Sequence, residues 1–251
     1  MLRKITIFGT ELPMFSVMSG IGIFLLLMIT LLKLRKKASF EKEVFYIIPK
    51  LVISLLMALG GAILFDALVK IPSNGGFKIS GITFYGGLIT GLSTMIILLI
   101  IFKKNTNLSV IEWLDFLTIP FIIFHICGRI GCFCAGCCYG SETNSFLGIL
   151  FPDVPENDIY HHNHKVYPTQ LFEIALLIII LIIIKIKKKY NFYIYGILYP
   201  LGRFGIEFFR GDNRGSYLLG LSPSQFVSII LILILISFLI IRKYKKNYRI
   251  E

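Results

Sequence analysis

The chain is organised around the segment His125-Ile-Cys-Gly-Arg-Ile-Gly-Cys-Phe-Cys-Ala-Gly-Cys-Cys-Tyr-Gly140, which follows directly on the apolar run Phe116-Leu-Thr-Ile-Pro-Phe-Ile-Ile-Phe124. This segment holds all five cysteines of the protein. Its dense glycines are expected to break the helix and to let the backbone approach a neighbour closely. An arginine at membrane depth is costly, so Arg129 is a candidate functional residue. A packing turn with buried, inert thiols would have the same composition.

Composition identifies the class of protein. The chain has 251 residues, of which 56% are hydrophobic and only 16% charged, and its mean hydropathy is +0.79. Apolar runs of about 20 residues predict transmembrane helices. We therefore predict an all-α polytopic membrane protein with a single integral membrane domain over residues 1–251. The seven predicted spans lie at about 15–34, 46–69, 84–102, 112–131, 168–186, 192–209 and 222–241. The first run lacks a signal-peptide cleavage site and is kept as a span.

The basic residues predict the orientation. Most of the 26 Lys and Arg residues lie in the loops after the first, third and fifth spans and in the C-terminal tail. The positive-inside rule then places the N-terminus outside, the C-terminus in the cytoplasm and the 141–167 loop on the extracytoplasmic side. The net charge of +12 is juxtamembrane and attracts anionic lipid, so no nucleic-acid partner is predicted.

Further polar residues fall near the outer ends of the predicted spans. They are Tyr85-Gly86-Gly87, Gln170 with Glu173, and Arg203, Glu207 and Arg210. A glycine-rich helix start can bind an anion, although close helix packing would use the same glycines. Arg203 and Glu207 are spaced to pair on one helical face, which a purely structural ion pair would also explain. Arginines pair well with phosphate, so the residues favour a lipid-modifying transferase or a lipid-binding protein.

Four stretches resemble the bacterial prolipoprotein diacylglyceryl transferase family, in that family's order. They are Phe84–Gly91, Gly128–Gly140, Tyr167–Glu173 and Arg203–Arg210. Ser222-Pro-Ser-Gln225 is similar to the family's last motif. The resemblance implies an enzyme of the bacterial cytoplasmic membrane that moves a diacylglyceryl group from phosphatidylglycerol to the lipobox cysteine of a prolipoprotein and releases glycerol phosphate.

The resemblance also implies part of the site. Arg129, Arg203 and Glu207 match family positions implicated in head-group binding or activity, and Gly140 matches the last glycine of the family signature. We predict no metal and no cofactor. The predicted catalytic residues are Tyr85, Arg129, Cys137, Arg203 and Glu207. The predicted substrate-binding residues are Gly86, Gly87, Cys132, Gly140, Gln170 and Arg210.

The chain departs from the family pattern at several polar positions. Tyr85 replaces a typical histidine, and Cys132, Ala135 and Cys137 replace Asn, Asn and Glu. A diacylglyceryl group on a cysteine nucleophile would be a thioether with no good leaving group, whereas an acyl or phosphoryl group could turn over. One alternative is therefore a paralogue that transfers such a group through Cys137 or Cys132. Another is a non-enzymatic lipid-binding protein. The cysteines could also bind a soft metal or form disulfides.

Overall fold

The computed structural model describes residues 3–7, 9–36, 39–69, 71, 76, 77, 79, 83–106, 108–150, 164–211 and 220–247. The chain divides into two compact units, each considered by itself. The first comprises Met1–Leu26, Thr118–Asn213 and Ser228–Glu251, and the second comprises Leu27–Leu117 and Arg214–Val227.

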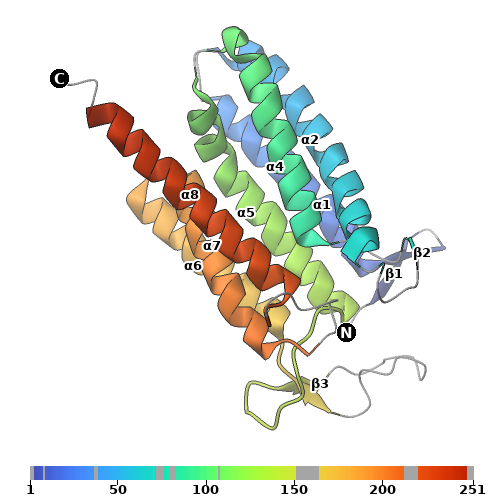
Figure 1. The fold of residues 1–251 in the computed structure, drawn as a ribbon. Coiled ribbons are helices and arrows are strands. Elements are labelled where there is room, and N and C mark those ends of the chain that lie inside the picture. Colours follow the sequence, from blue (N-terminus) through green and yellow to red (C-terminus); the bar gives the residue numbers. More distant parts are fainter. Residues whose placement is uncertain are drawn as a thin grey trace. The chain divides into compact units, whose positions relative to one another are not determined.

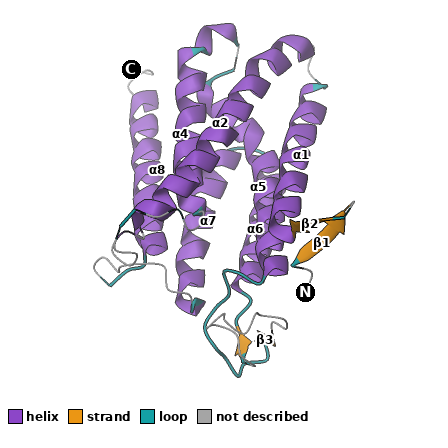
Figure 2. Ribbon diagram, turned by 90° about the vertical axis from the view of Figure 1, so that its right-hand side faces the viewer, coloured by secondary structure: helices purple, strands orange, loops and turns teal. Residues whose placement is uncertain are grey.

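The all-α prediction is confirmed. Within the described ranges, the helices of 16 residues or more are α1 (Met14–Leu34), α2 (Phe40–Val69), α4 (Phe84–Ile101), α5 (Val110–Ala135), α6 (Thr169–Lys187), α7 (Asn191–Ile206) and α8 (Pro223–Asn247). The short 3-10 helices η1 (Lys103–Asn105) and η2 (Glu207–Phe209) follow α4 and α7. Figure 2 shows how completely helices dominate. Two antiparallel hairpins pair β1 (Lys4–Ile7) with β2 (Thr10–Pro13) and β3 (Ile149–Leu150) with β4 (Lys165–Val166).

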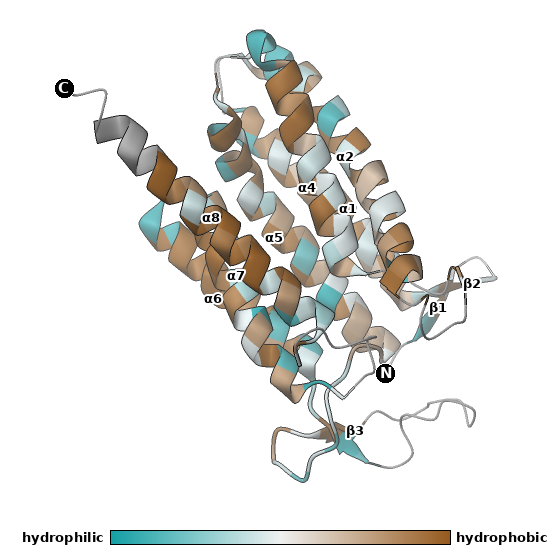
Figure 3. Cartoon of the chain, viewed as in Figure 1, coloured by the Kyte–Doolittle hydropathy of each residue, from teal (hydrophilic) through white to brown (hydrophobic). Residues whose placement is uncertain are grey.

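Length and hydropathy support a polytopic membrane protein. Among the described residues, six helices (α1, α2, α4, α5, α6 and α8) are long and apolar enough to cross a membrane. The remaining long helix, α7, has 16 residues before it tightens into η2. Hydrophobic residues run along the helices in Figure 3. Aliphatic side chains such as Ile179 and Leu233 are more than half exposed, as expected of helices that face lipid.

The first unit contains most of α5, α6, α7 and most of α8, and α6, α7 and α8 run side by side in Figure 1. The ring of Tyr193 on α7 stacks on Phe238 of α8 with 6.5 Å between centroids. Gly202 leaves room for Leu176 of α6, since a Cβ at residue 202 would lie 2.4 Å from a Leu176 methyl carbon. Small residues at such contacts let membrane helices approach closely.

The expected helix break in the cysteine segment is wrong for its first two glycines. Helix α5 continues through Gly128 and Gly131 to Ala135. Gly131 instead allows the backbones of α5 and α1 to approach closely, as predicted, because a Cβ at residue 131 would lie 3.2 Å from the Cα of Phe15 on α1. Gly136, the residue after the helix, has a φ of 72°. This left-handed conformation ends the helix and causes no steric strain in glycine.

The second unit packs α2 against α4 through glycines. A Cβ on Gly86 would lie 2.5 Å from the Cβ of Phe65, and one on Gly91 would lie 2.8 Å from the Cβ of Ala58. Tyr85 is buried at the start of α4. Within this unit, Gly86 and Gly91 therefore allow α2 and α4 to pack closely.

Candidate head-group site

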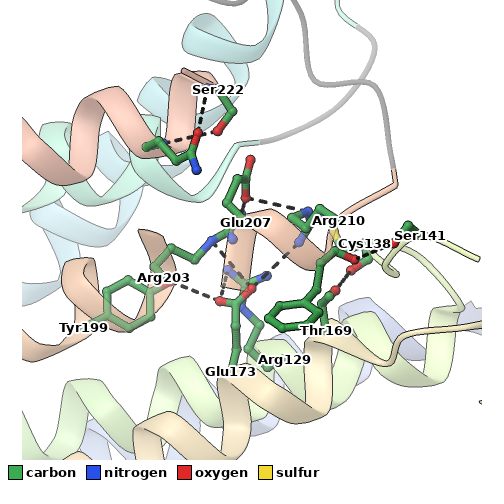
Figure 4. Close-up of polar contacts among 12 residues, drawn as sticks. Arg129, Cys138, Ser141, Thr169, Glu173, Tyr199, Arg203, Glu207, Arg210 and Ser222 are labelled. Carbon is green, nitrogen blue, oxygen red and sulfur yellow. Dashed lines mark hydrogen bonds and ion pairs between the residues drawn. The ribbon is translucent and has the colours of Figure 1, made fainter. Parts of the chain in front are cut away.

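A buried carboxylate lies at the centre of a charged cluster in the first unit (Figure 4). Glu173, on the first turns of α6, is fully buried. Its Oε2 lies 2.8 Å from Nη2 of Arg129, and its Oε1 lies 3.6 Å from Nε of Arg203 and 3.8 Å from Nη1 of Arg210. Three arginines from α5, α7 and the segment after η2 thus converge on one carboxylate.

A second carboxylate completes the cluster. Oε2 of Glu207 lies 2.6 Å from Nη2 of Arg203, which confirms the pair predicted from their spacing. The same oxygen lies 3.9 Å from Nε of Arg210. Among the described residues of the cluster, three guanidinium groups therefore face two carboxylates, an excess of one positive charge. Because isolated charge in a membrane helix is costly, this excess favours an anionic ligand.

Aromatic side chains hold the cluster from α7. Tyr195, Tyr199 and Arg203 recur every four residues, which places them on one helical face. The hydroxyl of Tyr199 donates to Oε2 of Glu173 at 3.1 Å. Nδ1 of His125 lies 3.1 Å from the hydroxyl of Tyr195, and the His125 ring meets the Tyr199 ring edge-on at 4.8 Å between centroids. These contacts orient the carboxylate that the arginines share.

The cysteine turn is fastened to the first turn of α6. The side-chain amide of Gln170 donates to the carbonyl of Cys137, and the hydroxyl of Thr169 donates to the carbonyl of Cys138, each at 2.6 Å. Both donors are fully buried. The turn that follows Arg129 is thereby fixed beside the helix that carries Glu173.

The Cys137 thiol is poorly suited to act as a nucleophile. Its contact with the Cys132 thiol lowers its pKa, but its contact with the Cys138 thiol and partial desolvation outweigh that effect and raise the pKa to about 11. A thiol with that pKa is almost entirely protonated near neutral pH, and the thiolate is the nucleophilic form.

Comparisons with known proteins identify the family. The family described as prolipoprotein diacylglyceryl transferase matches residues 4–241. The chain belongs to this family. It is similar to phosphatidylglycerol–prolipoprotein diacylglyceryl transferase 2 of Clostridium perfringens (strain 13 / Type A), with 34% identity over 244 residues that cover 90% of each chain. It is also similar to the phosphatidylglycerol–prolipoprotein diacylglyceryl transferases of Clostridium tetani (33% identity, 67% of each chain) and Dehalococcoides mccartyi (30% identity, 66% of this chain and 64% of the relative).

The predicted site residues fall into two sets. Those that the structure gathers in the first unit are Arg129, Cys132, Cys137, Gly140, Gln170, Arg203, Glu207 and Arg210. Tyr85, Gly86 and Gly87 belong to the second unit. The functional roles of the residues in both sets stay predictions.

Three residues that form or hold the charged cluster were not among the predicted site residues. Glu173 is the centre of the cluster, and Tyr199 and His125 hold it. Spacing would have pointed to two of them, because His125 lies four residues before Arg129 and Tyr199 four residues before Arg203. Glu173 was noted beside Gln170, but no spacing reveals partners on other helices.

Gly140 allows the segment after η2 to close over the cluster. It pairs with Arg210 in an isolated β-bridge, and its amide donates to the carbonyl of Tyr167 at 2.7 Å. A Cβ at residue 140 would lie 2.3 Å from the carbonyl oxygen of Phe209 and 2.6 Å from the Cβ of Tyr167. No side chain fits there without moving backbone.

Gly140→Ala is therefore expected to destabilise the protein by about 1–3 kcal/mol, the usual cost of overpacking. Thermal unfolding of the purified protein in detergent measures this. Gly128→Ala is the matched control, because no atom lies within 4 Å of a Cβ built there and alanine favours the helix. Equal melting temperatures for the two variants would contradict the packing role of Gly140.

Proposed function

We propose that the protein transfers the diacylglyceryl group of phosphatidylglycerol to the thiol of a cysteine in a prolipoprotein. Family membership and the names of the relatives support this transferase activity. The single observation that carries the proposal is the buried cluster in which, among the described residues, Arg129, Arg203 and Arg210 outnumber Glu173 and Glu207. Its excess positive charge matches the one negative charge of a phosphatidylglycerol phosphate.

The proposed chemistry uses this charge in the transition state. The acceptor sulfur forms a bond to the terminal glyceryl carbon of the diacylglyceryl group while the bond from that carbon to the phosphate oxygen breaks. The thiol proton leaves to solvent or to a base, and glycerol phosphate departs. Its phosphate gains negative charge as the bond breaks, so guanidinium groups stabilise the transition state more than the bound lipid.

Each charged residue has a proposed role. Arg129 and Arg203 hold the phosphate, and Arg210 adds positive charge from the segment that closes over them. Glu207 orients Arg203 through their 2.6 Å contact, and Glu173 fixes the spacing of all three arginines. Carboxylates are needed beside the arginines because three unbalanced cations would be too costly to bury in a membrane protein.

The proposed topology has seven spans, with the N-terminus outside and the C-terminus in the cytoplasm. Helix α7 together with η2 would be the seventh span, and the 141–167 loop would lie outside the bacterial cytoplasmic membrane. The polar cluster then faces the side on which secreted precursors emerge. The positive-inside distribution of Lys and Arg supports this orientation.

Incubation with both substrates tests the function. Purified protein in phosphatidylglycerol micelles receives a lipobox peptide, and released glycerol phosphate and peptide mass are followed together. The expected result is one glycerol phosphate released for each peptide that gains one diacylglyceryl unit. A peptide with serine in place of the lipobox cysteine is the control and should gain no mass. Lipid breakdown without peptide modification would contradict the proposed acceptor, and no breakdown would contradict the transferase.

A further inference from the structure

Three of the five cysteines bring their sulfur atoms together at the end of α5. The Sγ atoms of Cys132, Cys137 and Cys138 all lie within 4.8 Å of one another. No fourth His, Cys, Asp or Glu among the described residues joins this group. We propose that these three residues, called here the thiol cluster, bind one Cu(I) ion through trigonal thiolate coordination. The proposal does not rest on the proposed transferase activity.

The backbone of the turn gathers the sulfurs. Gly136 reverses the chain after α5 with a φ of 72°, and the amide of Cys137 donates to the carbonyl of Cys132 at 3.1 Å. Cys138 is also left-handed, with a φ of 65°. A side chain is costly in this conformation, and glycine would adopt it without strain. The presence of a thiol where glycine is favoured points to use of its sulfur.

The thiol cluster is held in place from outside. The carbonyls of Cys137 and Cys138 accept the 2.6 Å hydrogen bonds from Gln170 and Thr169, whose side chains are fully buried. Cys132 lies in the last turn of α5. Cys137 and Cys138 lie on a turn held by these hydrogen bonds, and Cys132 lies on a helix, so the three ligands are largely in place before a metal binds. Supporting contacts of this kind strengthen metal binding. Cys137 is exposed, which gives an ion access.

The ligand set favours Cu(I) over other ions. Thiolates select soft metals, and zinc in a structural site takes four protein ligands, one more than the thiol cluster offers. Three thiolates around a monovalent ion would carry a net charge of about −2 from simple charge counting, with the thiol protons released on binding. The guanidinium of Arg129 interacts electrostatically with Cys132 and Cys138 and would offset part of that charge.

Anaerobic titration of the reduced, full-length protein in detergent tests the proposal. Cu(I) is supplied against the chromophoric chelator bicinchoninate, and bound metal is counted by mass spectrometry. We expect one Cu(I) per chain, with three sulfur neighbours in its X-ray absorption spectrum. Cys137→Ser and Cys138→Ser should each weaken binding about 100-fold or more, because even supporting residues change metal affinity 10- to 100-fold. Cys134→Ser is the matched control and should bind as the unmodified protein does.

A second measurement needs no variant. Bound Cu(I) should protect Cys132, Cys137 and Cys138 of the unmodified protein from alkylation, while Cys134 reacts at the same rate with and without the ion. The proposal is overturned if the reduced protein binds no Cu(I), or if Cys134→Ser loses binding as Cys138→Ser does. Preferential binding of Zn(II), or a disulfide in this cluster that persists after reduction, would also overturn it.

Discussion

Replacing Glu173 with glutamine is expected to lower kcat for diacylglyceryl transfer about 100- to 1,000-fold, the range seen when one positioned donor to the transition state is lost, because the arginines that Glu173 positions would no longer be held toward the phosphate. Glutamine keeps the shape but removes the charge that Arg129, Arg203 and Arg210 share. Among the described residues of the cluster, one carboxylate, that of Glu207, would then face three buried guanidinium groups. Breaking a buried ion pair by removing one partner costs about 3–5 kcal/mol, so the variant should also be less stable.

The kinetic pattern of Glu173→Gln separates orientation from binding. Removing a negative charge makes the cluster more attractive to an anionic lipid, so KM should stay constant or fall while kcat collapses. Glycerol phosphate release over a range of phosphatidylglycerol concentrations gives both constants. Glu142→Gln is the matched control, because this glutamate is exposed and lies outside the cluster. A raised KM with unchanged kcat would show that Glu173 does not position the arginines.

The helices could be predicted from the sequence because continuous apolar runs in a chain of this composition have few other stable arrangements. Their ends could not. Helix α2 begins at Phe40, six residues before the predicted span. Its first turn carries Glu41, Lys42 and Glu43, charged residues that hydropathy excludes from a predicted span.

The candidate site was only partly predictable. The Arg203–Glu207 pair follows from helical spacing, since residues four apart share a face. The contact of Arg129 with Glu173 joins α5 to α6 across 44 positions, and no periodicity encodes such a contact. Likewise, five cysteines in one segment do not reveal which three sulfurs meet. Which sulfurs meet depends on the left-handed backbone conformations of Gly136 and Cys138, and these conformations can be seen only in the structure.

Arg203→Lys is expected to lower kcat about 100-fold or more although the positive charge is kept. Arg203 uses two edges of its guanidinium, with Nη2 at 2.6 Å from Glu207 and Nε at 3.6 Å from Glu173. A lysine offers one compact ammonium on a flexible stem and cannot hold both carboxylates and a phosphate in one plane. The remaining positive charge should still attract phosphatidylglycerol, so lipid binding should fall much less than turnover.

The experiment compares glycerol phosphate release and peptide modification with phosphatidylglycerol binding in the same detergent. Arg35→Lys is the matched control, because Arg35 is exposed just beyond the end of α1 and should leave both quantities unchanged. Loss of turnover with binding retained would argue against a pure lipid-binding protein, since such a protein has no turnover to lose. Near-normal turnover in Arg203→Lys would mean that charge alone suffices at this position, and the planar, two-edged contact with Glu207 and Glu173 would then have no part in the reaction.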